Sequence, residues 1–178
     1  MIYDIKSVVS KNDIIMLENL INQRNIDVYI VGDGEYTTIV AFKGIYETIY
    51  FINYPTVQAD NDEYPKMQFI TGIKNKPQFK KISNNRALKS VRICRDHVRW
   101  KVEENEWNVT IDVGIKLYFD DYQLLILAID SLGGLIKYYM GEHIQVGLSN
   151  EDLNEYWGFK TEELLSGNRE ELNLHDVK

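Results

Sequence analysis

The sequence predicts an α+β fold: an antiparallel sheet of about five to seven strands, a packed N-terminal helix, a long buried helix and a short acidic helical C-terminal tail. Three observations lead to this prediction. Residues 11–23 carry apolar side chains at helical spacing, residues 26–54 contain β-branched runs joined by tight turns, and residues 107–119 alternate between apolar and polar side chains. We expect residues 1–148 to form the α+β core and residues 149–178 to form an acidic helical appendage of the same domain.

The first predicted element is a capped amphipathic helix over residues 11–23. Ser10 and Asp13 have the spacing of a capping box, in which each side chain bonds to the backbone of the other residue. Apolar side chains then recur at helical spacing at Ile14, Leu17, Leu20 and Ile21.

Three strands joined by tight turns follow this helix. Residues 26–31 lead into the turn sequence Gly-Asp-Gly-Glu at residues 32–35, and residues 36–42 and 45–54 form two further β-branched runs. A phosphate-binding loop would need a helix after these glycines, whereas a strand follows. The pattern therefore predicts an antiparallel meander.

The middle of the chain is predicted to alternate between loops and short strands. Residues 55–65 form a polar loop, residues 67–73 a strand, and residues 74–85 a basic loop. Residues 86–102 fit a helix in part but alternate better as two short strands. The following cations would then lie on the face opposite the apolar side chains: Arg92, Arg95, Arg99 and Lys101.

A long strand and a long helix are predicted next. Residues 107–119 alternate without a fault, which indicates a strand with one buried face. Asp120 and Asp121 can cap a helix, and residues 124–129 are apolar on every side. We expect a helix buried on most of its circumference that ends at Gly141.

Shorter elements complete the prediction. The glycines at 133–134 indicate either a close backbone approach or a break in the long helix. We expect a last strand at residues 143–148, a short helix that starts at Ser149 and runs through Trp157, and a further helix over residues 161–166.

Composition limits the class of protein. The chain has 178 residues, of which 44% are hydrophobic and 26% charged, as in a compact globular protein. Its single cysteine, Cys94, allows no internal disulfide, and no apolar stretch reaches the roughly 18 residues of a membrane helix. We therefore expect a cytoplasmic protein without membrane contact. The abundance of Asn, Ile, Lys and Tyr is typical of an AT-rich genome, such as that of a low-GC bacterium, its phages or its mobile elements.

Thiol and metal chemistry have little support in the sequence. Cys94, Asp96 and His97 lie close together, but a nucleophile and its base normally converge from separate elements. His97, His143 and His175 are too scattered for a zinc site. We predict no cofactor and no metal.

One alternative enzymatic interpretation remains open. A metal-dependent nuclease needs clustered carboxylates near a lysine, and strand alternation would place Asp112 and Lys116 on one face, with Asp120 and Asp121 at the end of the strand. The simpler interpretation is a set of polar strand positions and a helix cap.

Charge is distributed very unevenly along the chain. Between Lys66 and Lys101 there are eleven Lys or Arg residues and one acid, whereas residues 120–178 have twelve acids and four basic residues, within a formal net charge of −7. A surface of one sign attracts partners of the other sign. The predicted partner-binding residues are Lys74, Lys76, Lys80, Lys81, Arg86, Lys89, Arg92, Arg95, Arg99 and Trp100.

The function predicted from these observations is stoichiometric binding without catalysis. We expect an inhibitor, of the immunity type or a counter-defence protein of a phage or mobile element, that docks its basic surface on an acidic protein or a nucleoprotein, such as a nucleic-acid-handling enzyme. The alternatives are an RNA or single-strand binder, which would combine the cations with aromatic side chains, and the nuclease.

Overall fold

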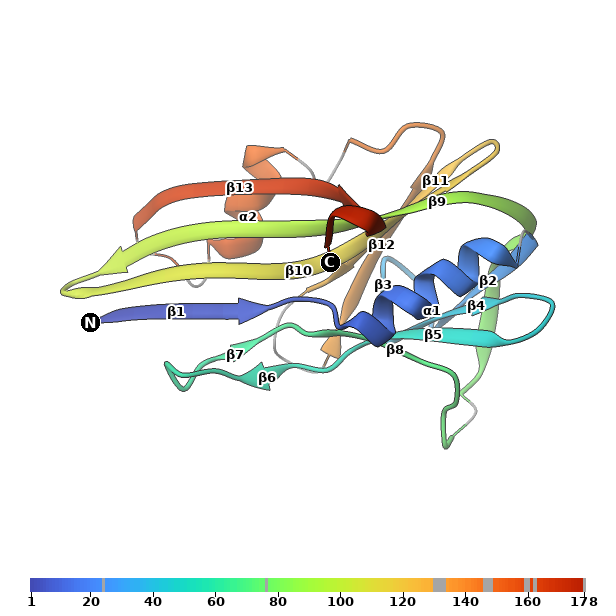
Figure 1. The fold of residues 1–178 in the computed structure, drawn as a ribbon, viewed down its shortest axis with the longest axis horizontal. Helices are drawn as coiled ribbons and strands as arrows, with labels where there is room; N and C mark the ends of the chain where they lie inside the picture. Colours follow the sequence, from blue (N-terminus) through green and yellow to red (C-terminus); the bar gives the residue numbers. More distant parts are fainter. Residues whose placement is uncertain are drawn as a thin grey trace.

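The structure is a computed structural model that describes residues 1–23, 25–75, 77–129, 134–145, 149–158, 161 and 163–177. Within these ranges, one sheet of 11 strands dominates the molecule, together with two α-helices and a separate two-stranded ribbon (Figure 1). No helix in the described ranges is long and apolar enough to span a membrane.

The elements follow one another along the chain with these bounds: β1 (Ile2–Ser7), α1 (Lys11–Asn22), β2 (Asn25–Val31), β3 (Tyr36–Thr37), β4 (Ile39–Lys43), β5 (Thr48–Asn53), β6 (Thr56–Val57), β7 (Glu63–Tyr64), β8 (Met67–Ile70), β9 (Phe79–Val102), β10 (Asn105–Phe119), β11 (Gln123–Ala128), β12 (Ile136–Gly141), α2 (Asn150–Trp157), β13 (Glu163–Asn173) and a 3-10 helix (Leu174–Val177).

The long hairpin of β9 and β10 organises the sheet. The main path runs β3-β12-β11-β10-β9-β2-β4-β5-β8, while β1 pairs in parallel with β10 and β13 pairs antiparallel with β9. In Figure 1, β13, β9, β10 and β1 lie side by side in one half of the molecule, and α1 lies near β2, β4 and β5 in the other half. Along its length, β9 pairs first with β2 and then with β13, while β10 pairs first with β1 and then with β11.

Two hydrophobic cores lie on the two sides of this sheet. The first joins Ile14, Leu17 and Leu20 of α1 to β2, β4, β5, β8 and parts of β9 to β12. The second contains Trp100 and Trp157 together with side chains from β1, β9, β10 and β11. The sheet is consequently buried on both faces along much of its centre.

The capped N-terminal helix is confirmed. Ser10 and Asp13 form the capping box of α1. In addition, Asp13 Oδ1 accepts a hydrogen bond of 3.2 Å from the backbone N–H of Phe69. One carboxylate thus caps the helix and ties it to β8, the last strand on the main path of the sheet.

The predicted fold class is wrong in its central feature, the long buried helix. Within the segment predicted as this helix, residues 123–128 form β11 and residues 136–141 form β12. In β11, Leu124 and Ile126 face the first core while Leu125 and Leu127 face the second. A strand buried on both faces is apolar at every position, as a fully buried helix is, so periodicity alone does not separate the two.

The strand count and the helical tail also need correction. The sheet has 11 strands instead of five to seven. Residues 79–102, predicted as part of a basic loop and two short strands, form the single 24-residue strand β9. The helix starting at Ser149 is confirmed, but in the helix predicted over residues 161–166, residues 163–166 belong to β13, whose partner β9 is distant in sequence.

Some predictions concern residues at the limit of the described ranges. Gly134 has a φ of +66°, and a Cβ there would lie 2.5 Å from the carbonyl oxygen of Asn53, so a close backbone approach accounts for this glycine. Gly133 and residues 146–148 of the predicted last strand lie outside the described residues. Residues 142–145 are not part of a strand.

Gly114 allows the close approach of β10 and β11, and its replacement by Ala is expected to lower the free energy of unfolding by about 1–3 kcal/mol. A Cβ there would lie 2.2 Å from the carbonyl oxygen of Ile126 and 2.7 Å from Leu127 Cδ2, so the strands must separate. Urea unfolding followed by circular dichroism measures the loss. Gly72→Ala is the control, because a Cβ at Gly72 meets no atom within 4 Å. Equal stability of the two variants would contradict the steric argument.

Candidate functional site

The predicted basic surface is largely neutralised within the molecule. β9 lies between strands and turns that carry acids, and these acids meet its cations at nitrogen–oxygen distances of 3.3 Å or less. The ion pairs are Lys80–Asp33, Lys81–Asp27, Arg86–Asp121, Lys89–Asp120, Arg92–Glu171, Arg95–Asp112 and Arg99–Glu106.

The remaining predicted site residues differ in their surroundings. Lys74 is exposed and has no ion pair with any residue that the structure describes. Lys76 lies outside the described residues. Trp100 is only 2% exposed and stacks on Trp107, with ring centroids 5.5 Å apart, so its ring is part of the second core and does not form a surface for stacking a base.

The cations also point to both sides of the sheet. Arg92 lies on the same side as Glu171, which pairs with it across β9 and β13. Arg95 and Arg99 lie on the other side, because their positions have the opposite parity along the strand. The structure therefore does not bring the predicted residues into one continuous basic surface.

A buried polar cluster links β13 and α2 to β9 through hydrogen bonds and an ion pair. Asp96 accepts two hydrogen bonds from the Arg169 guanidinium, at 2.6 and 2.7 Å, and one of 2.8 Å from Trp157 Nε1. Asp96 and the Arg169 side chain are almost completely buried. Because each charged group meets a partner, this cluster is a structural connection between the C-terminal segment and the sheet.

A second polar cluster surrounds Glu171 next to the first. Burial alone would raise the pKa of Glu171, but hydrogen bonds from Tyr118 and Lys116, with the charges of Lys116 and Arg92, hold this pKa below its ordinary value. Lys116 also donates to the carbonyl oxygen of Ile144 at 2.9 Å. Glu171 thus remains ionised and joins β13 to β9 and β10.

The residues considered for thiol chemistry do not form a site. Cys94 and Asp96 belong to the face of the second core, whereas His97 lies on the opposite face and contacts Thr110 and Glu170. Burial raises the pKa of the Cys94 thiol to about 12. Cys94 therefore remains protonated at neutral pH and packs as a small apolar side chain.

The residues considered for nuclease chemistry are separated by an irregularity in β10. The pairing of β10 with β9 shifts between Asp112 and Gly114, so the alternation of faces is interrupted there. As a result, Asp112 binds Arg95 on one face and Lys116 binds Glu171 on the other. In the part of the chain that the structure describes, no group of three His, Cys, Asp or Glu residues could hold a metal ion.

An apolar face that the sequence analysis did not identify lies on the side of β2, β4, β5 and β8 opposite the first core. We call it the outer face. Its side chains follow the strand register across β8, β5, β4, β2 and the start of β9, and none belongs to either core. The apolar members are Tyr29, Val31, Ile39, Ala41, Tyr50, Ile52, Ile70 and Phe79.

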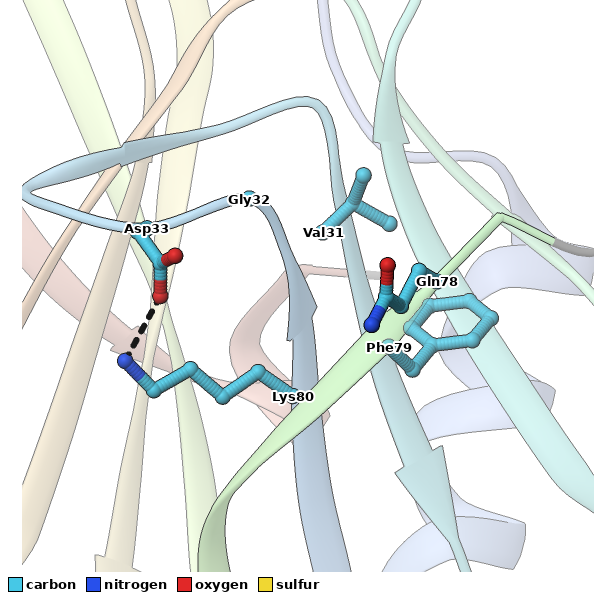
Figure 2. Close-up of a pocket in the computed structure, with 6 residues that line it drawn as sticks. All are labelled: Val31, Gly32, Asp33, Gln78, Phe79 and Lys80. Atoms are coloured by element: carbon cyan, nitrogen blue, oxygen red, sulfur yellow. Dashed lines mark hydrogen bonds and ion pairs between the residues drawn. The ribbon is translucent and has the colours of Figure 1, made fainter.

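Two hollows that share Phe79 lie at this face. One, of about 490 Å³, is lined by Val31, Gly32, Asp33, Gln78, Phe79 and Lys80. Figure 2 shows the Phe79 ring turned away from Lys80, which reaches toward Asp33 on the other side of the strand. The second, of about 220 Å³, is lined by Tyr29, Ala41, Lys43, Thr48, Tyr50 and Phe79.

The charges on the outer face are nearly balanced. Lys81 pairs with Asp27 at 2.9 Å and lies 5.2 Å above the ring of Tyr29. The hydrogen bond from Lys81 holds the pKa of Asp27 below its ordinary value, so the pair is ionised at neutral pH. Lys43, which lines the second hollow, has no ion pair within the described ranges.

A sequence signal for this face exists but is weak. Residues 28–31 and 49–52 are apolar or aromatic at both alternating positions, which is the pattern of strands with two apolar faces. Such a pattern does not reveal whether the second face is covered by another element. Only the arrangement of the strands shows that Tyr29, Tyr50 and Phe79 meet outside the core.

Comparison of the chain with protein-family models, curated proteins and solved structures found no match.

Proposed function

We propose that this chain is a non-enzymatic binding protein that acts as a stoichiometric inhibitor by docking its outer face on a protein partner. The observation that carries the proposal is the partly exposed apolar face, which belongs to neither core, with its two hollows that share Phe79. Contiguous exposed apolar surface on a globular protein commonly marks an interaction site.

The charges of the outer face favour a protein over a nucleic acid. A phosphate that approached Lys81 on this face would also meet Asp27, and one that approached Lys80 at the edge of the first hollow would meet Asp33. Binding to nucleic acid depends on cations that replace the counterions of phosphates. An apolar side chain of a protein, in contrast, needs no free charge on this face.

The unpaired cations indicate the chemistry of the partner surface. Lys43 lies in the second hollow beside Tyr50, and Lys74 lies in the connection between β8 and β9. An aromatic or aliphatic anchor in the hollow would contribute about 1.5–3 kcal/mol by complete burial. An acidic side chain next to this anchor would pair with Lys43. The proposed partner is therefore a protein with an apolar anchor flanked by acids.

The inhibitor class is retained from the sequence prediction. Blocking a partner requires a complementary surface and a slow dissociation rate, and no catalytic group. The outer face would therefore carry the immunity-type or counter-defence role that the sequence analysis gave to the basic residues between Lys74 and Arg99.

Phe79→Ala is expected to weaken binding of the protein partner at least tenfold, because Phe79 forms a wall of both hollows. The partner is captured from the native host's lysate after nuclease treatment, purified, and titrated by calorimetry, with an expected stoichiometry of one to one. Met140→Ala, which removes an exposed apolar side chain from β12, is the matched control and should leave the Kd unchanged.

Two outcomes would overturn the proposal. Recovery of nucleic acid alone, lost after nuclease treatment, would show that the chain binds RNA or single-stranded DNA. A captured protein whose Kd is equally insensitive to Phe79→Ala and to Met140→Ala would show that docking uses another surface.

A further inference from the structure

The turn between β4 and β5 presents two large apolar side chains to solvent. Tyr46 is 86% exposed and Ile45 is 72% exposed, although they are neighbours in a tight turn. A single exposed apolar residue is ordinary on a protein surface, whereas two at the tip of one hairpin form a compact apolar projection. We call residues 45–46 the hairpin tip.

A buried glutamine holds the backbone of this turn. Gln23, at the C-terminus of α1, accepts hydrogen bonds through Oε1 from the N–H groups of Tyr46 and Glu47, at 3.4 and 3.5 Å. Gly44 donates to the carbonyl oxygen of Glu47 at 3.0 Å and closes the turn. The tip is thus attached to the helix of the first core.

Gly44 leaves room for the Gln23 side chain beside the turn. A Cβ at residue 44 would lie 1.5 Å from Gln23 Oε1 and 2.2 Å from Gln23 Cδ, so any other residue there would displace the end of the Gln23 side chain from the turn. Gln23 is 4% exposed, and its Nε2 has no hydrogen-bond partner among the residues that the structure describes.

The hairpin tip adjoins the outer face. Lys43 and Thr48, which pair with each other at the ends of β4 and β5, line the second hollow and flank the turn. A partner side chain that fills this hollow would therefore lie next to the hairpin tip. A side chain held in its bound geometry loses little conformational entropy on binding, and tyrosine is enriched among residues that dominate binding energy.

We propose that the hairpin tip inserts Tyr46 and Ile45 into an apolar pocket of the same protein partner that the outer face binds. This inference rests on the proposed function. The contact is reciprocal: the partner fills the hollow beside Lys43 with its anchor and receives Tyr46 in its own pocket.

The test uses the photo-crosslinking amino acid p-benzoylphenylalanine at three positions of the full chain, namely 46, 79 and 54, expressed in the native host. Tyr54 is the control, because it is 61% exposed and follows the opposite end of β5. We expect one protein to crosslink at positions 46 and 79 but not at 54. With that protein purified, Tyr46→Ala should raise the Kd at least tenfold and Tyr54→Ala less than twofold.

The outcomes separate this inference from the proposed function. A protein that crosslinks at 79 but not at 46, or a Kd unchanged by Tyr46→Ala, overturns the role of the tip and leaves the outer face as the docking site. A crosslink at 46 to a second copy of this chain also overturns it. Absence of protein crosslinks at both 46 and 79 contradicts the proposed function itself.

Discussion

Replacing Arg169 with Met is expected to lower the free energy of unfolding by about 3–5 kcal/mol, the cost of removing one member of a buried ion pair. Asp96 is fully buried, and after the substitution its carboxylate would keep the hydrogen bond of 2.8 Å from Trp157 Nε1 but lose its positively charged partner. Such a charge must remain buried without compensation or take up a proton. Either result weakens the attachment of β13 to β9. Urea unfolding followed by circular dichroism measures the loss.

Two further variants test the cause of this effect. Arg86→Met removes the exposed ion pair with Asp121 and is expected to cost less than about 1 kcal/mol. The double variant Asp96→Leu, Arg169→Met removes both buried charges and should recover part of the loss, since it leaves no uncompensated carboxylate. If Arg169→Met and Arg86→Met cost the same, the buried pair does not hold β13 in place.

Asp112→Ala is expected to lower the free energy of unfolding by about 2–4 kcal/mol, somewhat less than for a fully buried pair. Asp112 accepts hydrogen bonds from Arg95 Nε and Nη2, at 2.6 and 3.1 Å, and from the backbone N–H of Val9 at 2.7 Å. Asp112 is 2% exposed, while the Arg95 side chain keeps 16% of its surface. Its carboxylate therefore joins β9, β10 and the segment that leads into α1.

A double-mutant cycle with Arg95→Ala isolates the ion pair from the contact with Val9. We expect a coupling free energy of about 1–3 kcal/mol between Asp112 and Arg95 from the same urea titrations. The same variants also test the nuclease alternative. A Mg²⁺-dependent cleavage of DNA that disappears in Asp112→Ala while stability stays unchanged would make Asp112 a catalytic residue instead of a structural one.

The basic segment shows why the candidate site could be found only in part. Lys74, Lys80 and Lys81 were predicted as partner-binding residues, and Lys80 does line a hollow of the candidate site. The sequence does not reveal that Asp33 neutralises Lys80 or that Asp27 neutralises Lys81, because the members of each pair are about 50 residues apart.

The sequence by itself determined the elements that depend on residues close together in the chain. The capping boxes at Ser10 and Ser149 depend on neighbours a few positions away, and both are confirmed. The strand predicted over residues 107–119 is also confirmed as part of β10, but its single buried face is wrong, because Val109, Ile111 and Val113 face the second core whereas Ile115, Leu117 and Phe119 face the first. Short-range hydrogen bonds and side-chain alternation act within a segment, so a segment is enough to predict them.

The tertiary structure alone decided the features that depend on distant partners. Residues 124–129 are apolar on all sides, and pairing with β10 and β12 makes them a strand between two cores. The shift in β10 places Asp112 and Lys116 on opposite faces, and β13 supplies the acid that neutralises Arg92. In each case, the stabilising interactions join residues from different strands. A local sequence pattern does not show which strand will lie next to it.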